Sequence, residues 1–164
     1  MYLDIAGILF IVIMSVFMQN LLDLSGHTLI GVMFGSVNDS IWEIEKTLLF
    51  PYLLWAGIEL LCIKIPFRKF IVAKAVSLWF FCLSYSAICL LYSLTGAQTH
   101  FLPEFTAALI CCTLAFFISF RLTVGGKKCE LLFYPAFFML LLFVVLYCSL
   151  TPFPMHNYLF MDRT

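Results

Sequence analysis

Residues 70–94 read FIVAKAVSLWFFCLSYSAICLLYSL, an apolar run that contains a single charged side chain, Lys74. A helix over this run would be about 37 Å long, which exceeds the roughly 30 Å thickness of the hydrocarbon core of a bilayer. One charged side chain in such a run is far fewer than a surface that faces water would carry. The segment therefore predicts a helix that crosses a membrane.

Four further segments share this character. A membrane-spanning helix needs about 20 apolar residues, and such runs occur at about 5–22, 41–63, 105–122 and 131–150. The first run lacks the basic n-region and the small-residue cleavage site of a signal peptide, so we expect it to be a retained helix. The predicted fold is an all-α integral membrane bundle of about five transmembrane helices, with residues 1–164 forming a single domain.

The composition favours the same environment. Of the 164 residues, 64% are hydrophobic and 11% are charged, whereas about a quarter of a soluble domain is charged. The lipid bilayer is therefore an expected partner. The formal net charge is zero, which leaves no basic surface for nucleic acid. No spacing of His or Cys residues resembles a metal site, so we expect no metal and no cofactor.

The positions of the basic residues predict the orientation. Lys and Arg gather in cytoplasmic loops of membrane proteins, and seven of the nine basic residues flank two loops that would share one side. The N-terminus is therefore predicted to be cytoplasmic and the C-terminus extracytoplasmic. In consequence, His27, His100 and His156 are predicted to lie on the outer side, as are most of the acidic residues. The seven basic residues are Lys64, Arg68, Lys69, Lys74, Arg121, Lys127 and Lys128.

The most distinctive polar segment begins the second span. Residues 35–46 read GSVNDSIWEIEK. Ser40 and Glu43 have the spacing of a capping box, in which the serine hydroxyl accepts a backbone bond and the glutamate reaches back. Trp42 fits an aromatic anchor at the membrane interface. A helix cap explains neither Asn38 and Asp39 nor Glu45, and we interpret these residues as candidates for ligand binding.

A polar stripe continues along the same predicted helix. Glu45, Tyr52 and Glu59 are seven residues apart and fall within about 40° on one face. An acid inside a membrane normally faces the bundle interior and has a partner, and Lys74 on the next helix lies at a similar depth. One interpretation is a structural ion pair with helix-packing hydroxyls. The other is a polar cavity or proton path between these two helices, with Pro51 supplying a kink.

Residues 36–51, SVNDSIWEIEKTLLFP, resemble a family of small bacterial multi-pass membrane proteins of unknown function. The recurring pattern of that family is Val-Asn-Glu-Ser-x-Trp-Glu-His, followed by Lys and Phe-Pro. The resemblance implies a location in the bacterial cytoplasmic membrane and implies no activity. Ile44 and Gln19 stand where histidines are expected, which weakens any metal-binding interpretation of this chain.

Three functions are compatible with these patterns. The favoured one is binding of a small solute, ion or lipid in a polar cavity open to the extracytoplasmic face, with no catalytic residue. The first alternative is an accessory or scaffolding subunit that packs against a membrane-protein partner or a second copy of the chain. The second alternative is a membrane enzyme with an outer-face His and carboxylate site, which is less favoured because no catalytic motif is present. The predicted ligand-binding residues are Asn38, Asp39, Trp42, Glu43, Glu45, Tyr52, Glu59, Lys74, His100 and His156.

Overall fold

The computed structural model describes residues 2–37, 40–62, 65–94, 101–125 and 129–150. These residues form helices and turns and contain no strand, so the all-α prediction is confirmed. Each of the five predicted spans coincides with a helix to within a few residues. The elements in order are α1 Tyr2–Gln19, α2 Leu21–Leu24, α3 Leu29–Phe34, α4 Ile41–Cys62, α5 Phe67–Leu94, α6 Phe101–Gly125, the 3-10 turn η1 Cys129–Leu132 and α7 Phe133–Leu150.

Several of these helices have the length and composition of membrane spans. Within the described residues, α5 and α6 are long and apolar enough to cross a membrane, and α1 and α7 contain shorter apolar helices. The α4 helix carries four charged side chains, yet all of them are buried. Its exposed large side chains are apolar, namely Leu54, Ile58 and Leu61. The outward surface of α4 is therefore apolar even though its sequence is the most charged of the long helices.

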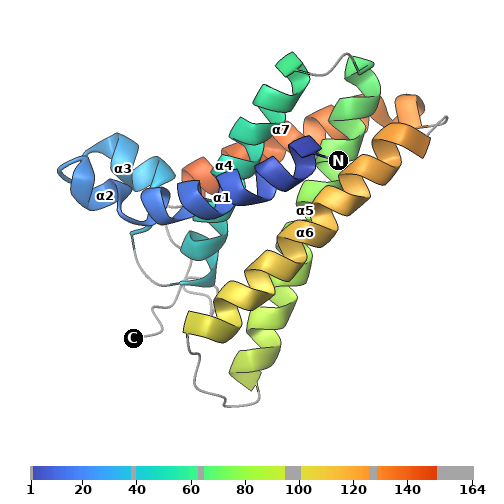
Figure 1. Ribbon diagram of the computed structural model, residues 1–164. Coiled ribbons are helices and arrows are strands. Elements are labelled where there is room, and N and C mark those ends of the chain that lie inside the picture. Colours follow the sequence, from blue (N-terminus) through green and yellow to red (C-terminus); the bar gives the residue numbers. More distant parts are fainter. Residues whose placement is uncertain (1, 38–39, 63–64, 95–100, 126–128, 151–164) are drawn as a thin grey trace.

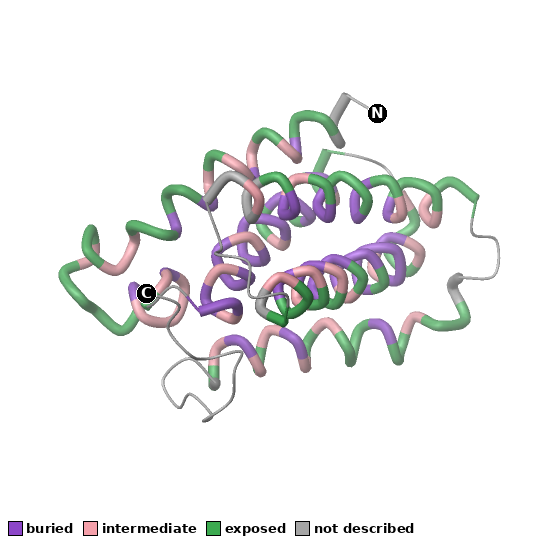
Figure 2. Tube along the Cα trace, turned by 90° about the horizontal axis from the view of Figure 1, so that it is seen from below, coloured by how far each residue is buried: buried purple, intermediate pink, exposed green. Residues whose placement is uncertain are grey.

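The α5 helix is the centre of the arrangement. It packs against α4, α6 and α7, while α1 lies across α4 and α6. Figure 1 shows α5 and α6 side by side and antiparallel. In Figure 2 the buried residues line the inner faces of the helices, and the exposed ones cover the outside.

Small residues on α6 allow its close approach to α5. One face of α6 consists of buried alanines and cysteines, and small side chains let two helix backbones come near each other. In the structure they are packed within the chain. They are Ala107, Ala108, Cys111, Cys112 and Ala115.

A glycine sets the contact between α1 and α4. The indole ring of Trp55 occupies the space where a side chain of residue 7 would begin. A Cβ atom added at Gly7 would lie 2.7 Å from Trp55 Cδ1, closer than real Cβ contacts allow. Phe10 packs on the same indole with ring centroids 5.2 Å apart. The absence of a side chain at Gly7 is therefore what lets α1 lie against α4.

The α2 and α3 helices form a projection at one end of the bundle, visible at the left of Figure 1. The chain reverses between them through Gly26 and His27, whose φ angles are 67° and 57°. The apolar stretch of residues 28–34, which is too short to span a membrane, forms α3. Leu29 is 74% exposed and Ile30 is 64% exposed, so this short helix presents an apolar surface outward.

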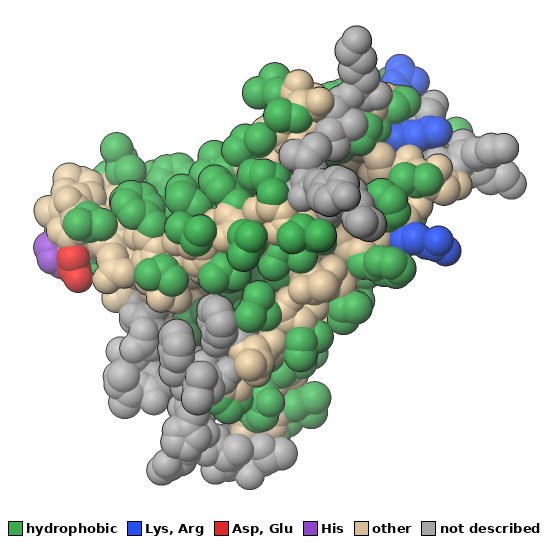
Figure 3. Space-filling view, viewed as in Figure 1, with side chains coloured by type: hydrophobic (Ala, Val, Ile, Leu, Met, Phe, Trp, Pro, Cys, Tyr) green, Lys and Arg blue, Asp and Glu red, His purple; other side chains and the backbone are tan. Residues whose placement is uncertain are grey.

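Exposed charges lie at opposite ends of the molecule. Figure 3 shows Lys and Arg side chains along one edge, and acidic and His side chains at the tip of the α2–α3 projection. Among the described residues, Arg68 and Arg121 are exposed near the basic edge, and Asp23 and His27 are exposed at the tip. Large apolar side chains cover much of the surface between these ends. This is the charge distribution on which the predicted orientation depends.

Candidate binding site

The α4 helix carries three buried carboxylates. Glu43, Glu45 and Glu59 are each less than 5% exposed. Glu45 and Glu59 lie two heptads apart, so the helical period directs both toward the helices packed on the same side of α4. Each of the three has a different set of partners, and the difference identifies the candidate site.

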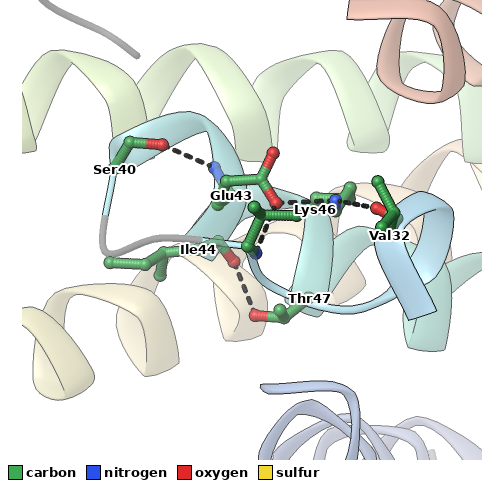
Figure 4. A network of polar contacts seen from close by, with 7 residues as sticks. Val32, Ser40, Glu43, Ile44, Lys46 and Thr47 are labelled. Carbon is green, nitrogen blue, oxygen red and sulfur yellow. Dashed lines mark hydrogen bonds and ion pairs between the residues drawn. The ribbon is translucent and has the colours of Figure 1, made fainter. Parts of the chain in front are cut away.

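Glu43 belongs to a network at the start of α4 (Figure 4). The backbone N–H of Glu43 donates to the Ser40 hydroxyl at 3.4 Å, which is one half of the predicted capping box. The Glu43 carboxylate lies 2.6 Å from the ammonium group of Lys46. It also accepts from the backbone N–H of Val37 at 3.1 Å. Glu43 therefore does more than cap the helix, because it joins α4 to the segment that precedes it.

Lys46 extends this connection to α3. Its side chain is fully buried, and its ammonium group donates to the backbone carbonyl of Val32 at 2.9 Å. That carbonyl lies in the last turn of α3, where carbonyl groups lack a partner within the helix and attract positive charge. Glu43 and Lys46 together hold residues 32–37 against the first turns of α4.

Glu59 forms the ion pair with Lys74 that the sequence predicts. Both residues are 3% exposed. The Lys74 ammonium group also lies 5.1–5.4 Å from the ring centroids of Tyr52, Phe70 and Phe116. These distances are within the range of cation–π attraction. Both charges of this pair are therefore compensated by the protein itself.

Tyr52 and Ser77 form a second contact between α4 and α5. Their hydroxyl oxygens are 2.6 Å apart, and the Ser77 hydroxyl also donates to the Lys74 carbonyl at 3.1 Å. The predicted polar stripe on α4 thus meets Lys74 and Ser77 on α5. This arrangement matches the structural interpretation of the Glu59 and Lys74 pair.

Glu45 is the exception among the three carboxylates. The Tyr147 hydroxyl donates to Glu45 Oε2 at 2.6 Å, and the Ser86 hydroxyl donates to Glu45 Oε1. Within the described part of the chain, no Lys or Arg lies within ion-pair distance of it. A buried carboxylate without a cation is costly. Its neighbours stabilise it through hydroxyl groups that come from two other helices.

Aromatic rings fix the position of the Tyr147 hydroxyl. The Trp42 ring stacks on Tyr147 with centroids 4.0 Å apart and an interplanar angle of 6°. Phe143 stacks on Tyr147 at 4.7 Å, and Trp79 meets Phe143 edge-on at 5.1 Å. Stacked pairs of this kind stabilise beyond the apolar area that they bury. Trp42, which the sequence suggests as an interfacial anchor, is half-buried and holds α7 against α4.

The structure brings several of the predicted site residues together. Glu45, Tyr52, Glu59 and Lys74 follow the α4–α5 contact, and Trp42 and Glu43 adjoin them at the start of α4. Asn38, Asp39, His100 and His156 lie outside the described residues. Among the described residues, no group of three or more His, Cys, Asp or Glu side chains could hold a metal ion.

Ser86 and Tyr147 were missed by the sequence reasoning. Ser86 lies about 120° around an ideal helix from Lys74, so the face of α5 that carries Lys74 does not include it. Tyr147 is 102 residues away from Glu45 along the chain. Its only sequence signal is a hydroxyl group in a largely apolar predicted span, where a polar atom needs a partner.

Comparison with known proteins gives a family and no activity. Nothing matches among curated proteins, and nothing matches among solved structures. A family model described as a family of unknown function (DUF6512) matches residues 2–164. The resemblance to a family of unknown function is confirmed to that extent, while the Trp-Glu motif stays a prediction. Because the match covers nearly the whole chain, the protein belongs to this family of unknown function.

Proposed function

We propose that this chain is a multi-pass protein of the bacterial cytoplasmic membrane. The five spans are α1, α4, α5, α6 and α7, with a cytoplasmic N-terminus and an extracytoplasmic C-terminus. Two observations support this proposal. The outward side chains of these helices are largely apolar, and the charges of α4 point into the bundle, where membrane proteins keep ionisable residues.

We further propose that the protein binds a small solute, ion or lipid headgroup at a polar site in its extracytoplasmic half. The observation that carries this proposal is Glu45, a carboxylate that is 2% exposed and has only hydroxyl partners among the described residues. Its desolvation is costly and does nothing evident for folding, because an apolar side chain would pack there without that cost. An ionisable residue in a membrane span is by default a functional-site candidate.

The position of Glu45 suits access from the outer side. Glu45 lies in the second turn of α4, next to the network that joins α4 to residues 32–37. A ligand that enters from the outer face would reach Glu45 before it reached the Glu59 and Lys74 pair.

Transport would require more than this chain supplies. Secondary transporters are commonly built from paired structural repeats that rock around a central site, and five helices are few for that design. A transport activity would therefore need a membrane-protein partner or a second copy of the chain. Binding alone has no such requirement.

The test is a thermal-unfolding screen of the purified protein in detergent. The probes are NaCl, KCl, CaCl2, a mixture of amino acids, inorganic phosphate and phosphatidylglycerol. A ligand at 100 times its Kd stabilises the native state by about 2.7 kcal/mol. We expect at least one probe to raise the Tm of the wild type and to leave Glu45→Gln unchanged.

The matched control is Ser84→Ala. Ser84 lies on α5 two residues from Ser86, but its hydroxyl donates to the Phe81 carbonyl of its own helix at 3.0 Å. We expect this variant to respond to the probes as the wild type does. A screen in which no response depends on Glu45 would refute the proposal.

A further inference from the structure

Two buried carboxylates on one face of α4 have partners of different charge. At the Glu59 level, a carboxylate on α4 meets the ammonium group of Lys74. At the Glu45 level, a carboxylate on the same face of α4 meets the hydroxyls of Ser86 and Tyr147. The chain supplies a cation at the first level and, among the described residues, none at the second.

We infer that the ligand of the Glu45 site is a small monovalent cation that exchanges with a proton on the Glu45 carboxyl group. This inference rests on the function proposed above and narrows its ligand class. No bond between carbon and oxygen changes. The proton leaves the carboxyl oxygen for bulk water, the cation takes its place, and the net charge of the site stays the same.

The sum of the buried charges indicates a ligand that carries a single positive charge. Within the described residues, the buried Asp, Glu, Lys and Arg side chains are three carboxylates and two ammonium groups, which leaves one negative charge without a counterpart. Lys46 and Lys74 are already paired with Glu43 and Glu59. A divalent cation would leave an uncompensated positive charge in the bundle, and an anion would add to the negative one. Both outcomes are costly in a medium of low dielectric constant.

The atoms around the charge suit a hard cation. The Glu45 carboxylate comes from α4, the Ser86 hydroxyl from α5 and the Tyr147 hydroxyl from α7. Carboxylate and other oxygen ligands favour hard cations. When the cation is absent, a proton on the carboxyl group neutralises it, and the hydroxyls retain hydrogen-bond partners. Ion and proton therefore compete for the same oxygens.

The experiment measures protons released when a cation binds. Purified protein in detergent and a weakly buffered indicator dye would receive NaCl or methylammonium chloride in place of choline chloride, at constant ionic strength. A comparison of the two salts shows whether the cation that binds is a metal ion or an organic ammonium ion. We expect the wild type to release about one proton per chain with at least one of them, and Glu45→Gln to release none.

Two variants keep the test valid if Glu45→Gln fails to fold. Ser86→Ala retains the carboxylate and removes one ligand, and a lost hydrogen bond to a charged group predicts a half-saturating concentration about tenfold higher or more. Ser84→Ala is its matched control on the same helix, and we expect it to release protons as the wild type does. Equal saturation curves for Ser86→Ala and the wild type would overturn the inference.

The outcomes separate this inference from the function on which it rests. If neither salt releases protons while a neutral or anionic probe of the thermal screen stabilises the protein through Glu45, the cation is wrong and the binding site stands. If no probe and no salt has an effect that depends on Glu45, both proposals fail. Proton release that persists in Glu45→Gln would place the exchanging group elsewhere and would also overturn the inference.

Discussion

Removing either member of the Glu59 and Lys74 pair should destabilise the protein strongly. Both side chains are 3% exposed, so neither charge can turn to water when its partner is lost. Removal of one partner of a buried pair typically costs about 3–5 kcal/mol, whereas replacing both by uncharged side chains of similar volume is often nearly neutral. We expect Glu59→Gln and Lys74→Met each to lower the free energy of unfolding by about 3–5 kcal/mol.

The double variant makes this prediction specific. Glu59→Gln combined with Lys74→Met should recover most of the loss, which gives a coupling energy of at least about 3 kcal/mol in a double-mutant cycle. The assay is reversible unfolding in mixed detergent micelles, followed by circular dichroism. The control pair is Asp23 and His27, whose side chains are 83% and 74% exposed. Asp23→Asn should cost less than about 1 kcal/mol.

One result would refute the reasoning about this pair. If Glu59→Gln and Lys74→Met each cost less than about 1 kcal/mol and their effects simply add, the two charges are not desolvated together. The surface of α4 that carries Glu59 would then face water or a partner protein. Such a result would also remove the physical basis for the comparison with Glu45, in which Glu45 is a buried carboxylate that lacks the cation that Lys74 supplies to Glu59.

Two further changes test the packing at other positions. Lys46→Met should leave Glu43 without its cation and lower the free energy of unfolding by about 3–5 kcal/mol. The amide proton of Val37 should then exchange faster with solvent. An unchanged exchange rate would show that Lys46 does not hold this segment. Gly7→Val should collide with Trp55 and lower the free energy of unfolding by about 1–3 kcal/mol. Gly57→Val is its control, because a Cβ there meets nothing within 4 Å, and equal losses in these two variants would contradict the α1–α4 contact.

The sequence predicts the helices well because each long helix contains many apolar residues in succession. Each of the five predicted spans is a largely apolar run that ends where polar residues begin, so the bounds of α1, α4, α5, α6 and α7 fall within a few residues of the expected ones. The short α3 helix lies outside these five runs. A helix of this length has little intrinsic stability, and contacts from α4, such as that of Lys46 with Val32, help to hold it.

The residues of the candidate site could be predicted from the sequence only where they share one face of one helix. The period of α4 places Glu45, Tyr52 and Glu59 on one side, and depth in the bundle selects Lys74 as a partner. The rest depends on how helices cross. Ser86 lies on a different face of α5 from Lys74, and Tyr147 arrives from a helix far along the chain. A single helical period cannot encode contacts of this kind.

Similarly, the role of Glu43 could be predicted only in part. The spacing from Ser40 identifies a cap, and the bond to the Ser40 hydroxyl is present. The ion pair with Lys46 joins residues three apart on α4, which the helical period allows, whereas the contact with Val37 depends on how the segment before α4 lies. Val37 lies outside any helix, and sequence periodicity carries no information about the position of such a residue.

The most direct test of the account is the side of the membrane on which each end of the bundle lies. A membrane-impermeant maleimide applied to intact cells would compare Asp23→Cys with Arg121→Cys, both at exposed positions. Cys62, an exposed native cysteine, lies at the end of α4 that is predicted to be cytoplasmic and should stay unlabelled. We predict labelling of Asp23→Cys from outside and labelling of Arg121→Cys only after permeabilisation. Labelling of both from the same side would contradict a bundle that crosses the membrane with the Glu45 site near its outer face.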